Sequence, residues 1–258
     1  IAGGSGRGDG VKIMSCEILG KSESGSSGAG LAGQIRAIKY AADNGAVICQ
    51  NSWGYTAGTI SVTDWTRGSY SALSRAMEYF NKYAGLDENG NQTGPMAGGI
   101  VLFAAGNDAS SEVCYPAADA NAISVGATAF TGAPAYYTNY GPGCNIAAPG
   151  GDAYQSYLEN INTGASEVLS TVNGGKYGYM QGTSMACPHV SGVAALGLSY
   201  ALQLGKTFTQ NEFTTLLLTS VNDINQYCTG TKQYFTDKGS LATLDLSQYK
   251  KGMGTGYI

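Results

Sequence analysis

The sequence predicts an α/β fold built on a mainly parallel central sheet. Strand-like, helix-like and strand-like patterns follow one another within residues 11–54, an order that favours parallel strands joined by a crossover helix. A strongly apolar run at 99–107 (GIVLFAAGN) is typical of a strand covered on both faces. The 258 residues, 43% of them hydrophobic, are enough for one sizeable core, so we expect a single domain over residues 1–258.

The first elements follow from hydrophobic spacing. Residues 11–19 (VKIMSCEIL) are largely apolar and typical of a buried strand. Residues 30–45 place apolar side chains at helical spacing and end in Asn-Gly, which stops a helix. Residues 46–54 (AVICQNSWG) are strand-like again. Residues 63–83 predict a second helix whose core contacts are Trp65, Leu73, Met77 and Phe80.

The second half of the chain continues the alternation. Residues 121–128 and 144–150 predict two further short strands beyond the run at 99–107. A long, apolar helix of small residues is expected from Ser184 to about Leu204. Residues 208–221 predict another helix, with Thr209 as its N-cap.

Composition and charge exclude two classes of partner. The net charge is −4 and no basic run exceeds two residues, so we expect no nucleic acid. The longest apolar stretches, residues 97–106 and 190–202, are too short to span a bilayer. Glycine and tyrosine are abundant, at 39 and 18 residues. With few lysines and glutamates, this composition suits an exported protein.

The six cysteines are too few for a dense disulfide framework at this length. Cys16, Cys49 and Cys187 lie in apolar settings and are predicted to be buried thiols. Cys114 and Cys144 lie in loop-like segments and could pair in an oxidising compartment. Because connectivity cannot be deduced from sequence, paired and free states both stay open.

Ser184, in the stretch QGTSMACPHV (181–190), is a candidate nucleophile. A serine at a helix N-terminus meets unpaired backbone N–H groups and the positive end of the helix dipole. That environment favours an alkoxide or a neighbouring oxyanion. The alternative is that this serine block only caps a buried helix.

The single histidine, His189, is a poor base for Ser184. A serine hydroxyl needs a base to take its proton. Five residues along a helix amount to about 140° of rotation and roughly 7.5 Å of rise, whereas a base must reach within about 3 Å. Pro188 further restricts the backbone between the two side chains. We therefore expect a structural role for His189 and a base from outside this chain.

Two further blocks end predicted strands. In AAGND (104–108), Asn107 can present its amide at the carboxyl edge of the sheet, where α/β folds place their sites. With a backbone N–H at Ser184 it would form an oxyanion hole, although it could equally be a turn asparagine. In QNSWGY (50–55), the Ser-Trp-Gly edge could pair with an extended peptide, or be an ordinary strand end.

Together these blocks resemble the subtilisin-like serine proteases. GTSMACPHVSGVAAL (182–196) resembles the serine block of that family, AAGND its oxyanion block and NSWG its substrate-binding strand. Residues 115–128 and 136–151 resemble the segments that follow the oxyanion block, and residues 11–20 with the AADNGA helix resemble an earlier strand and helix. The resemblance covers nearly the whole chain. It implies a three-layer fold, with a mainly parallel central sheet and helices on both faces, and serine endopeptidase activity through an acyl-enzyme.

The resemblance also assigns roles to individual residues. Ser184 would be the nucleophile and Asn107 the oxyanion donor. Asp108 would lie near the floor or rim of the pocket for the residue before the cut, which could take a large apolar or a basic side chain. The pocket walls would be Ser52, Trp53 and Gly54 on one side, and Ala104, Ala105 and Gly106 on the other.

The sequence departs from the family in one respect. The family triad runs Asp, His, Ser, and its Asp and His blocks precede the region where this chain starts. The resemblance thus implies the C-terminal portion of one catalytic domain, incomplete on its N-terminal side. A nicked enzyme with a bound N-terminal fragment, a truncated polypeptide, and a peptide-binding pseudoprotease all stay open. The first is favoured because the family's N-terminal segment supplies central strands and a helix, and without it large apolar faces would meet water.

No cofactor is required for this chemistry, but calcium is possible. Many relatives bind calcium, and Asp119 and Asn121 offer oxygen ligands near the YPA loop. Loop carboxylates are more often simply solvated, so both interpretations stay open.

Overall fold

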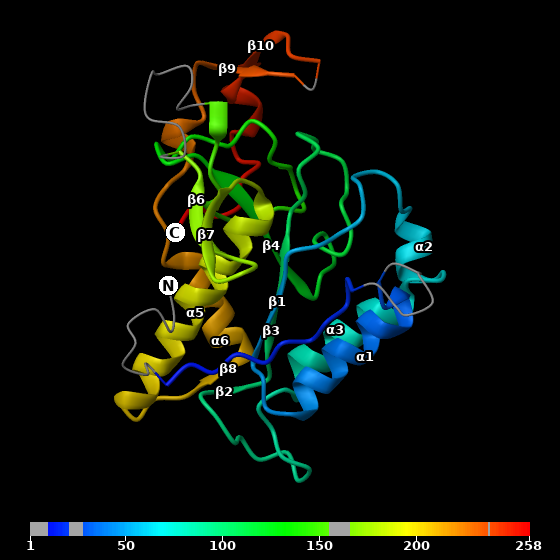
Figure 1. Cartoon of the computed structure of the whole chain (residues 1–258). Helices are drawn as coiled ribbons and strands as arrows, with labels where there is room; N and C mark the ends of the chain where they lie inside the picture. The colour runs from blue at the N-terminus through cyan, green and yellow to red at the C-terminus, as the bar shows by residue number, and fades with distance from the viewer. Residues whose placement is uncertain (1–9, 21–27, 155–165, 237) are drawn as a thin grey trace.

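A four-stranded parallel sheet lies at the centre of the molecule (Figure 1). The computed structural model describes residues 10–20, 28–154, 166–236 and 238–258. The strand order is β1-β3-β4-β5, and each neighbouring pair is parallel. The strands are β1 (Ile48–Asn51), β3 (Ile100–Ala104), β4 (Ala122–Thr128) and β5 (Ile146–Pro149).

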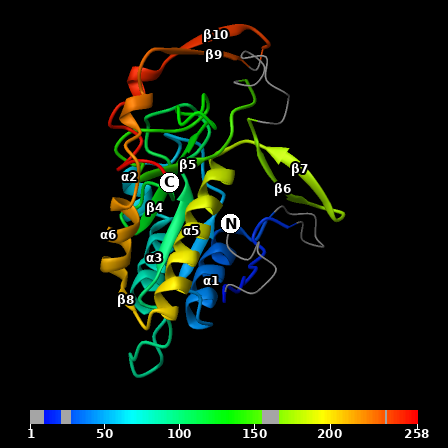
Figure 2. The same cartoon turned by 90° about the vertical axis from the view of Figure 1, so that its left-hand side faces the viewer.

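Helices cover both faces of this sheet, as Figures 1 and 2 show. Helices α1 (Gly30–Asp43) and α3 (Ser71–Tyr83) form one layer, and α5 (Thr183–Gln203) and α6 (Gln210–Thr219) form the other. The predicted three-layer α/β architecture is therefore confirmed.

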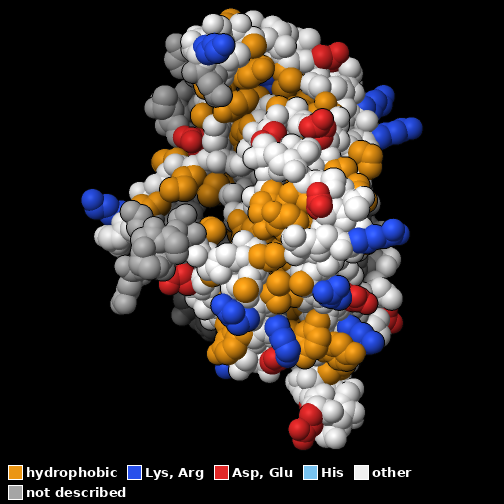
Figure 3. All heavy atoms as spheres, turned by 90° about the vertical axis from the view of Figure 1, so that its right-hand side faces the viewer, with side chains coloured by type: hydrophobic (Ala, Val, Ile, Leu, Met, Phe, Trp, Pro, Cys, Tyr) orange, Lys and Arg blue, Asp and Glu red, His pale blue; other side chains and the backbone are white. Residues whose placement is uncertain are grey.

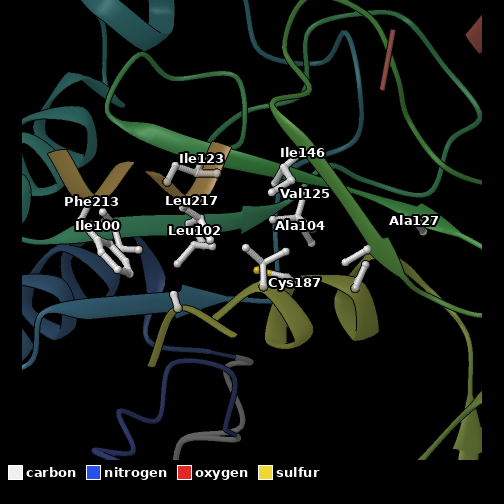
Figure 4. Packing of buried hydrophobic residues seen from close by; sticks show 14 of the residues in the cluster. Ile100, Leu102, Ala104, Ile123, Val125, Ala127, Ile146, Cys187, Phe213 and Leu217 are labelled. Carbon is white, nitrogen blue, oxygen red and sulfur yellow. The ribbon is translucent and has the colours of Figure 1, made fainter. Parts of the chain in front are cut away.

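The alternation of side chains along β3 separates the two cores. All five residues of β3 are buried. Ile100, Leu102 and Ala104 pack with α5 and α6, whereas Val101 and Phe103 pack with α1 and α3. Figure 4 shows the first core, in which side chains from β3, β4 and β5 meet Cys187, Phe213 and Leu217. Period-two alternation in a fully buried strand is what a sheet between two helical layers requires.

Shorter elements surround the three layers. Strand β2 (Met96–Ala97) pairs in parallel with β8 (Phe208–Thr209). Two antiparallel hairpins are formed by β6 (Val168–Val172) with β7 (Lys176–Met180), and by β9 (Thr231–Phe235) with β10 (Leu241–Asp245). Shorter helices with bounds inside the described residues are α2 (Val62–Thr66), η1 (Asn225–Tyr227) and η2 (Leu246–Tyr249).

Most predicted elements lie within a few residues of their expected bounds. Thr209 caps α6 as predicted: its Oγ1 accepts from Glu212 N at 3.3 Å, and a Glu212 carboxylate oxygen accepts from Thr209 N at 2.8 Å. The helix predicted at 63–83 is instead two helices, α2 and α3. The break coincides with Gly68, where a Cβ atom would lie 2.7 Å from Asp64 Cα. The four predicted core residues of this region are at most 1% exposed: Trp65, Leu73, Met77 and Phe80.

The strand predicted at 11–19 is wrong. These residues form no strand, and Ile13 and Leu19 are 90% and 69% exposed. Within the described residues β1 is the last strand of the sheet and pairs only with β3. An apolar run forms a buried strand only where a neighbouring strand supplies backbone hydrogen bonds and other elements cover its side chains. Among the described residues, no strand pairs with residues 11–19.

Helix α5 is longer than its apolar stretch at 190–202 indicates. By length and composition alone, its 21 residues could cross a membrane, a test that the core helix of a globular protein also passes. One side of α5 packs against β1, β3, β4 and β5. Only 33% of its most apolar stretch is buried, however. Its exposed apolar side chains are Leu196, Tyr200 and Leu202, followed by Leu204 just beyond its end.

Truncation of Phe80 tests the core between α3 and the sheet. Phe80 is 0% exposed, whereas Tyr83, three residues later on the same helix, is 45% exposed. We expect Phe80→Ala to lower the free energy of unfolding by about 3–5 kcal/mol, because it leaves a cavity. Tyr83→Ala, the matched control, should change it by about 0.5 kcal/mol or less. Urea denaturation followed by circular dichroism measures both, and equal losses would contradict this packing.

Candidate functional site

Ser184 is held by a turn that only glycine can form easily. It is the second residue of α5, directly after Gly182 and Thr183. Gly182 has φ of 147°, which side-chain-bearing residues rarely adopt. Its N–H donates to Gly150 O at 2.9 Å, and Tyr137 Oη donates to the same carbonyl at 2.9 Å. Burial raises the pKa of Tyr137, so its hydroxyl remains a neutral donor to this carbonyl.

A pair of hydrogen bonds connects Ser184 to the end of β1. Ser184 Oγ donates to Ser52 O at 3.3 Å, and Ser52 Oγ donates to Ser184 O at 2.7 Å. Pro188, inside α5, has no N–H to donate to the carbonyl of Ser184 four residues earlier. Ser52 Oγ therefore satisfies a carbonyl that the helix leaves unpaired.

Asn107 lies beside this serine with its amide fixed at one end. Asn107 Oδ1 accepts from Thr183 N and from Thr183 Oγ1, both at 2.9 Å. In the described part of the chain, Asn107 Nδ2 makes no hydrogen bond. A Cβ atom on Gly182 would lie 3.7 Å from that nitrogen. An exposed amide donor next to the N-terminus of the serine helix is the arrangement that stabilises an oxyanion.

A hollow of about 290 Å³ opens next to Ser184. It brings together most of the two predicted walls. Its lining is Trp53, Gly54, Tyr55, Thr56, Ala104, Gly106, Asn107, Asp108, Cys114, Thr183 and Ser184. Ser52 lies outside the lining but contacts Ser184 directly, and the backbone N–H of Ala105 extends the sheet by donating to Val125 O at 3.0 Å. A second hollow, of about 400 Å³, is lined by residues 16–20, a single short stretch of the chain.

Asp108 supplies the one charge among these lining residues. Its side chain is exposed, which places the carboxylate at the rim. Oδ2 accepts from Ala57 N at 3.3 Å and from Asn139 Nδ2 at 3.1 Å. The pocket therefore has a fixed negative charge at one side.

His189 does not serve the hydroxyl of Ser184. Its Nδ1 lies 2.8 Å from Met185 O, one turn back along α5. The ring is thus engaged with the backbone of its own helix. The hydroxyl of Ser184 contacts a carbonyl oxygen of Ser52, which is not basic enough to activate it.

Comparison with known proteins identifies the family. Residues 1–247 match the subtilase family, peptidase S8. The chain belongs to the subtilase family. This subtilase is 33% identical over 187 residues to the thermophilic serine proteinase of Bacillus sp. (strain AK1), covering 72% of this chain and 35% of that protein. It is 40% identical over 130 residues to the extracellular basic protease of Dichelobacter nodosus, covering 50% of this chain and 20% of that protein.

A solved structure supports the fold of this subtilase. The epidermin leader peptide processing serine protease (EpiP) from Staphylococcus aureus matches with a TM-score of 0.60 and 24% identity. The match covers 92% of this chain and 54% of that structure. The chain thus spans about half of the EpiP structure and about a third or less of the two curated relatives.

Sequence reasoning about this subtilase missed four lining residues: Tyr55, Thr56, Cys114 and Thr183. Thr183 and Tyr55 lie inside blocks already singled out, and proximity to Ser184 and Trp53 was the available signal. Cys114 carried no such signal, because its loop indicated only a possible disulfide. In the structure its Sγ donates to Tyr55 O at 3.1 Å and so joins two lining segments.

The possible Cys114–Cys144 disulfide is not formed in this subtilase. All six cysteines are free. Cys144 Sγ contacts Ile146 O at 3.7 Å, while Cys114 lines the pocket. Burial raises the pKa of Cys114 to about 11 and that of Cys144 to about 12. Cys187 is buried as predicted, whereas Cys16 and Cys49 are only half-buried.

Both carboxylate oxygens of Asp119, one of the two residues considered for calcium, accept hydrogen bonds within the protein. Asp119 Oδ1 accepts from Asn121 N at 2.7 Å and from Asn121 Nδ2 at 2.9 Å. Asp119 Oδ2 accepts from Trp65 Nε1. No group of three or more potential metal ligands occurs among the described residues. Asp119 and Asn121 therefore brace this loop in the subtilase.

Substitution of Gly106 tests the wall next to Asn107. Gly106 has φ of 106°, and a Cβ atom there would lie 2.2 Å from Asn139 Nδ2 and 3.0 Å from Cys114 Sγ. Gly90 has φ of 80° with nothing within 4 Å, so it is a matched control for backbone strain alone. We expect Gly106→Ala to lower the free energy of unfolding by about 1–3 kcal/mol more than Gly90→Ala. Equal losses in urea denaturation would argue against the close packing of this wall.

Thiol titration tests the cysteine assignment. Unfolded protein without reductant should release six equivalents of thiol in a DTNB assay, because all six cysteines are free. In the native protein, alkylation of Cys114 should accelerate about tenfold per pH unit up to its pKa of about 11. The thiolate is the reactive form, and a raised pKa keeps it scarce at neutral pH. Four equivalents and a cross-linked Cys114–Cys144 peptide would contradict the structure.

Proposed function

We propose that this subtilase chain is the nucleophile-bearing part of a serine endopeptidase. Ser184 is the nucleophile and Asn107 the oxyanion donor, while the histidine base and its aspartate belong to a polypeptide segment outside this sequence. One observation carries the proposal. The two hydrogen bonds from Thr183 fix Asn107 Oδ1 and leave the donor end of the amide beside Ser184.

The geometry supports a two-step acyl transfer. A peptide pairs with the strand end at Ser52–Gly54 and places one side chain in the pocket. The histidine takes the proton of Ser184 Oγ, which attacks the scissile carbonyl carbon. The developing negative oxygen accepts from Asn107 Nδ2 and from backbone N–H groups of the first turn of α5. The histidine then protonates the leaving amine, and water releases the acyl group from Ser184 by the reverse sequence.

The hydrogen bonds around Ser184 favour a catalytic base that comes from another polypeptide segment. The chain has one histidine, and its Nδ1 contacts Met185 O. Ser184 Oγ has a carbonyl as its hydrogen-bond partner in the described structure. The nucleophile is therefore positioned but not activated by the residues around it.

Uncovered apolar surface supports a docked segment. Helix α5 exposes apolar side chains such as Leu196 and Tyr200, and Ile13 is 90% exposed. Exposed apolar area costs about 25 cal/mol per Å², and large patches of it indicate interaction sites. β1 also ends the sheet with an unpaired edge in the described residues. A strand and a helix docked here would cover the exposed side of α5, the side chain of Ile13 and the unpaired edge of β1.

The start of the described chain passes close to this place. A Cβ atom on Gly10 would lie 3.5 Å from Ser199 Oγ on α5, and Cys16 Sγ lies 4.0 Å from Ala37 O on α1. Residues 10–20 thus run from one helical layer to the other (Figure 1). We infer that the docked segment lies between β1 and residues 11–19, and gives that apolar run the neighbour it lacks.

The proposed substrates are peptides or proteins, and the proposed location is outside the cell. The negative rim at Asp108 suits a basic side chain before the cut, and the ring of Trp53 a large apolar one. Two relatives are named an extracellular basic protease and an extracellular protease. Figure 3 shows one face on which acidic and basic side chains are interspersed, which is not the continuous basic surface that nucleic acid favours.

A peptide-binding pseudoprotease is the second candidate. It is favoured by the engagement of the only histidine with Met185 O rather than with Ser184. In that case peptides would occupy the pocket without turnover. A truncated polypeptide would behave in the same way.

Active-site labelling of native material separates these candidates. We expect a fluorophosphonate probe to label Ser184 in protein isolated with its companion segment, because only an activated serine reacts. Ser184→Ala should abolish labelling. Ser191→Ala on the same helix, whose Oγ donates to Pro188 O, should leave labelling intact. No labelling while intact-mass measurement shows the companion present would exclude the enzyme.

Removal of the oxyanion donor should lower turnover without abolishing folding. We expect Asn107→Ala to reduce kcat by ~10²- to 10³-fold, a value measured for another subtilase rather than derived from this structure. KM should change little, since the amide acts on charge that develops in the transition state. Steady-state hydrolysis of a chromogenic peptide measures both. An unchanged kcat would remove Asn107 from the oxyanion hole.

A further inference from the structure

Asn139 is a buried side chain that braces the loop carrying Asn107. It is 3% exposed. Its Oδ1 accepts from Asp108 N at 2.9 Å and from Ser110 N at 3.1 Å. Its Nδ2 donates to Ala105 O at 3.0 Å and to Asp108 Oδ2 at 3.1 Å. These four bonds use the full capacity of a side-chain amide, which has two donors and two acceptor sites.

The contacts of Asn139 bracket Asn107 from both sides. Its backbone N–H adds a bond to Gly106 O at 3.0 Å. Asn139 therefore contacts the loop immediately before Asn107, at Gly106, and immediately after it, at Asp108. The side chain of Asn107 is held by Thr183, which also accepts from Gly106 N at 3.2 Å. Asn139, from the segment between β4 and β5, is the side chain that holds this loop on both sides of Asn107.

We propose that Asn139 is a positioning residue, which holds the Asn107 amide and the Asp108 carboxylate in their places at the pocket. This inference rests on the proposed function for its catalytic consequence, but not for its structural one. Asn139 touches neither the substrate nor Ser184. It acts through the loop at 105–110, where a displacement of about 1 Å can cost about 10²-fold in rate.

The chemistry of the site requires an amide at this position. An aspartate would keep the acceptor for Asp108 N and Ser110 N, but would lose both donors. It would also place a second carboxylate about 3 Å from Asp108 Oδ2, where two charges cannot both persist. The other titratable group here is the thiol of Cys114, which lies beside Asn139 and is neutral at and below pH 8.

Asn145 offers a matched control elsewhere in the fold. Its Oδ1 accepts from Ser124 N at 2.7 Å, so it also braces a loop against β4. Ser124 lies near the amino end of β4, whereas the pocket lies beyond the carboxyl ends of the strands. Asn145→Ala thus reports the cost of losing a half-buried asparagine contact without touching the loop at 105–110.

Hydrogen exchange tests the structural part in the chain itself. We expect Asn139→Ala to accelerate amide exchange within residues 105–111 by about tenfold or more, because the N–H groups of Asp108 and Ser110 lose their acceptor. Asn145→Ala should leave this peptide unchanged. Unchanged exchange in Asn139→Ala, or equal acceleration in both variants, would overturn the proposal.

Kinetics test the catalytic part in the native complex, in a sample kept free of the fluorophosphonate probe. We expect Asn139→Ala to lower kcat by about 10- to 100-fold with little change in KM, while Asn145→Ala keeps the kcat of the wild type. The rate of Asn139→Asp relative to wild type should rise as pH falls, because a proton shared with Asp108 restores one donor. A flat ratio, or an unaltered kcat in Asn139→Ala, would overturn the proposal.

Failure of the proposed function can be distinguished from failure of the positioning role of Asn139. If the wild-type complex is not labelled at Ser184, the proposed function fails and hydrogen exchange alone decides the role of Asn139. If Asn139→Ala does not fold, the nearly isosteric Asn139→Asp carries both measurements.

Discussion

The two hydrogen bonds from Thr183 to Asn107 Oδ1 are the constraint on which the site depends. They tie the first turn of α5 to the loop that leaves β3. Because the sheet is parallel, the ends of β1 and β3 lie at the same edge, and α5 meets that edge with its N-terminus. Ser52, Asn107 and Ser184 therefore converge although they come from three distant parts of the sequence.

Close packing of α5 against the sheet depends on small side chains. Ala186, Cys187 and Ala194 are at most 1% exposed and face the core formed with β3 and β4. A bulkier helix face would hold the axis further from the sheet. The first turn of α5 would then lie too far from Asn107 for direct hydrogen bonds. The geometry of the site is thus partly fixed by residues that never contact it.

The parts of the fold that local sequence determines were predictable. Helical spacing identified Trp65 and Phe80 as core residues, and the serine and oxyanion blocks identified Ser184 and Asn107. The strand expected at 11–19 failed because a strand depends on a neighbour, which local sequence does not specify.

Contacts between residues far apart in the sequence were the other feature that the sequence could not predict. The bonds from Asn139 to the oxyanion loop span 29–34 residues, and Cys114 meets Tyr55 across 59 residues. Neither residue lies in a motif with a recognisable chemical pattern. Only the fold reveals that Cys114 lines the pocket and that Asn139 braces the loop beside it.

Pro188, in the second turn of α5, links the backbone of Ser184 to the strand end at Ser52. Since Pro188 leaves the carbonyl of Ser184 without its helical partner, the backbone at Ser184 is held by Ser52, at the end of β1, as well as by its own helix. In the proposed enzyme, a peptide paired with residues 52–54 would therefore be coupled to Ser184, and the coupling would act in both directions. Two hydroxyl hydrogen bonds between Ser52 and Ser184 would carry it across the gap between strand and helix.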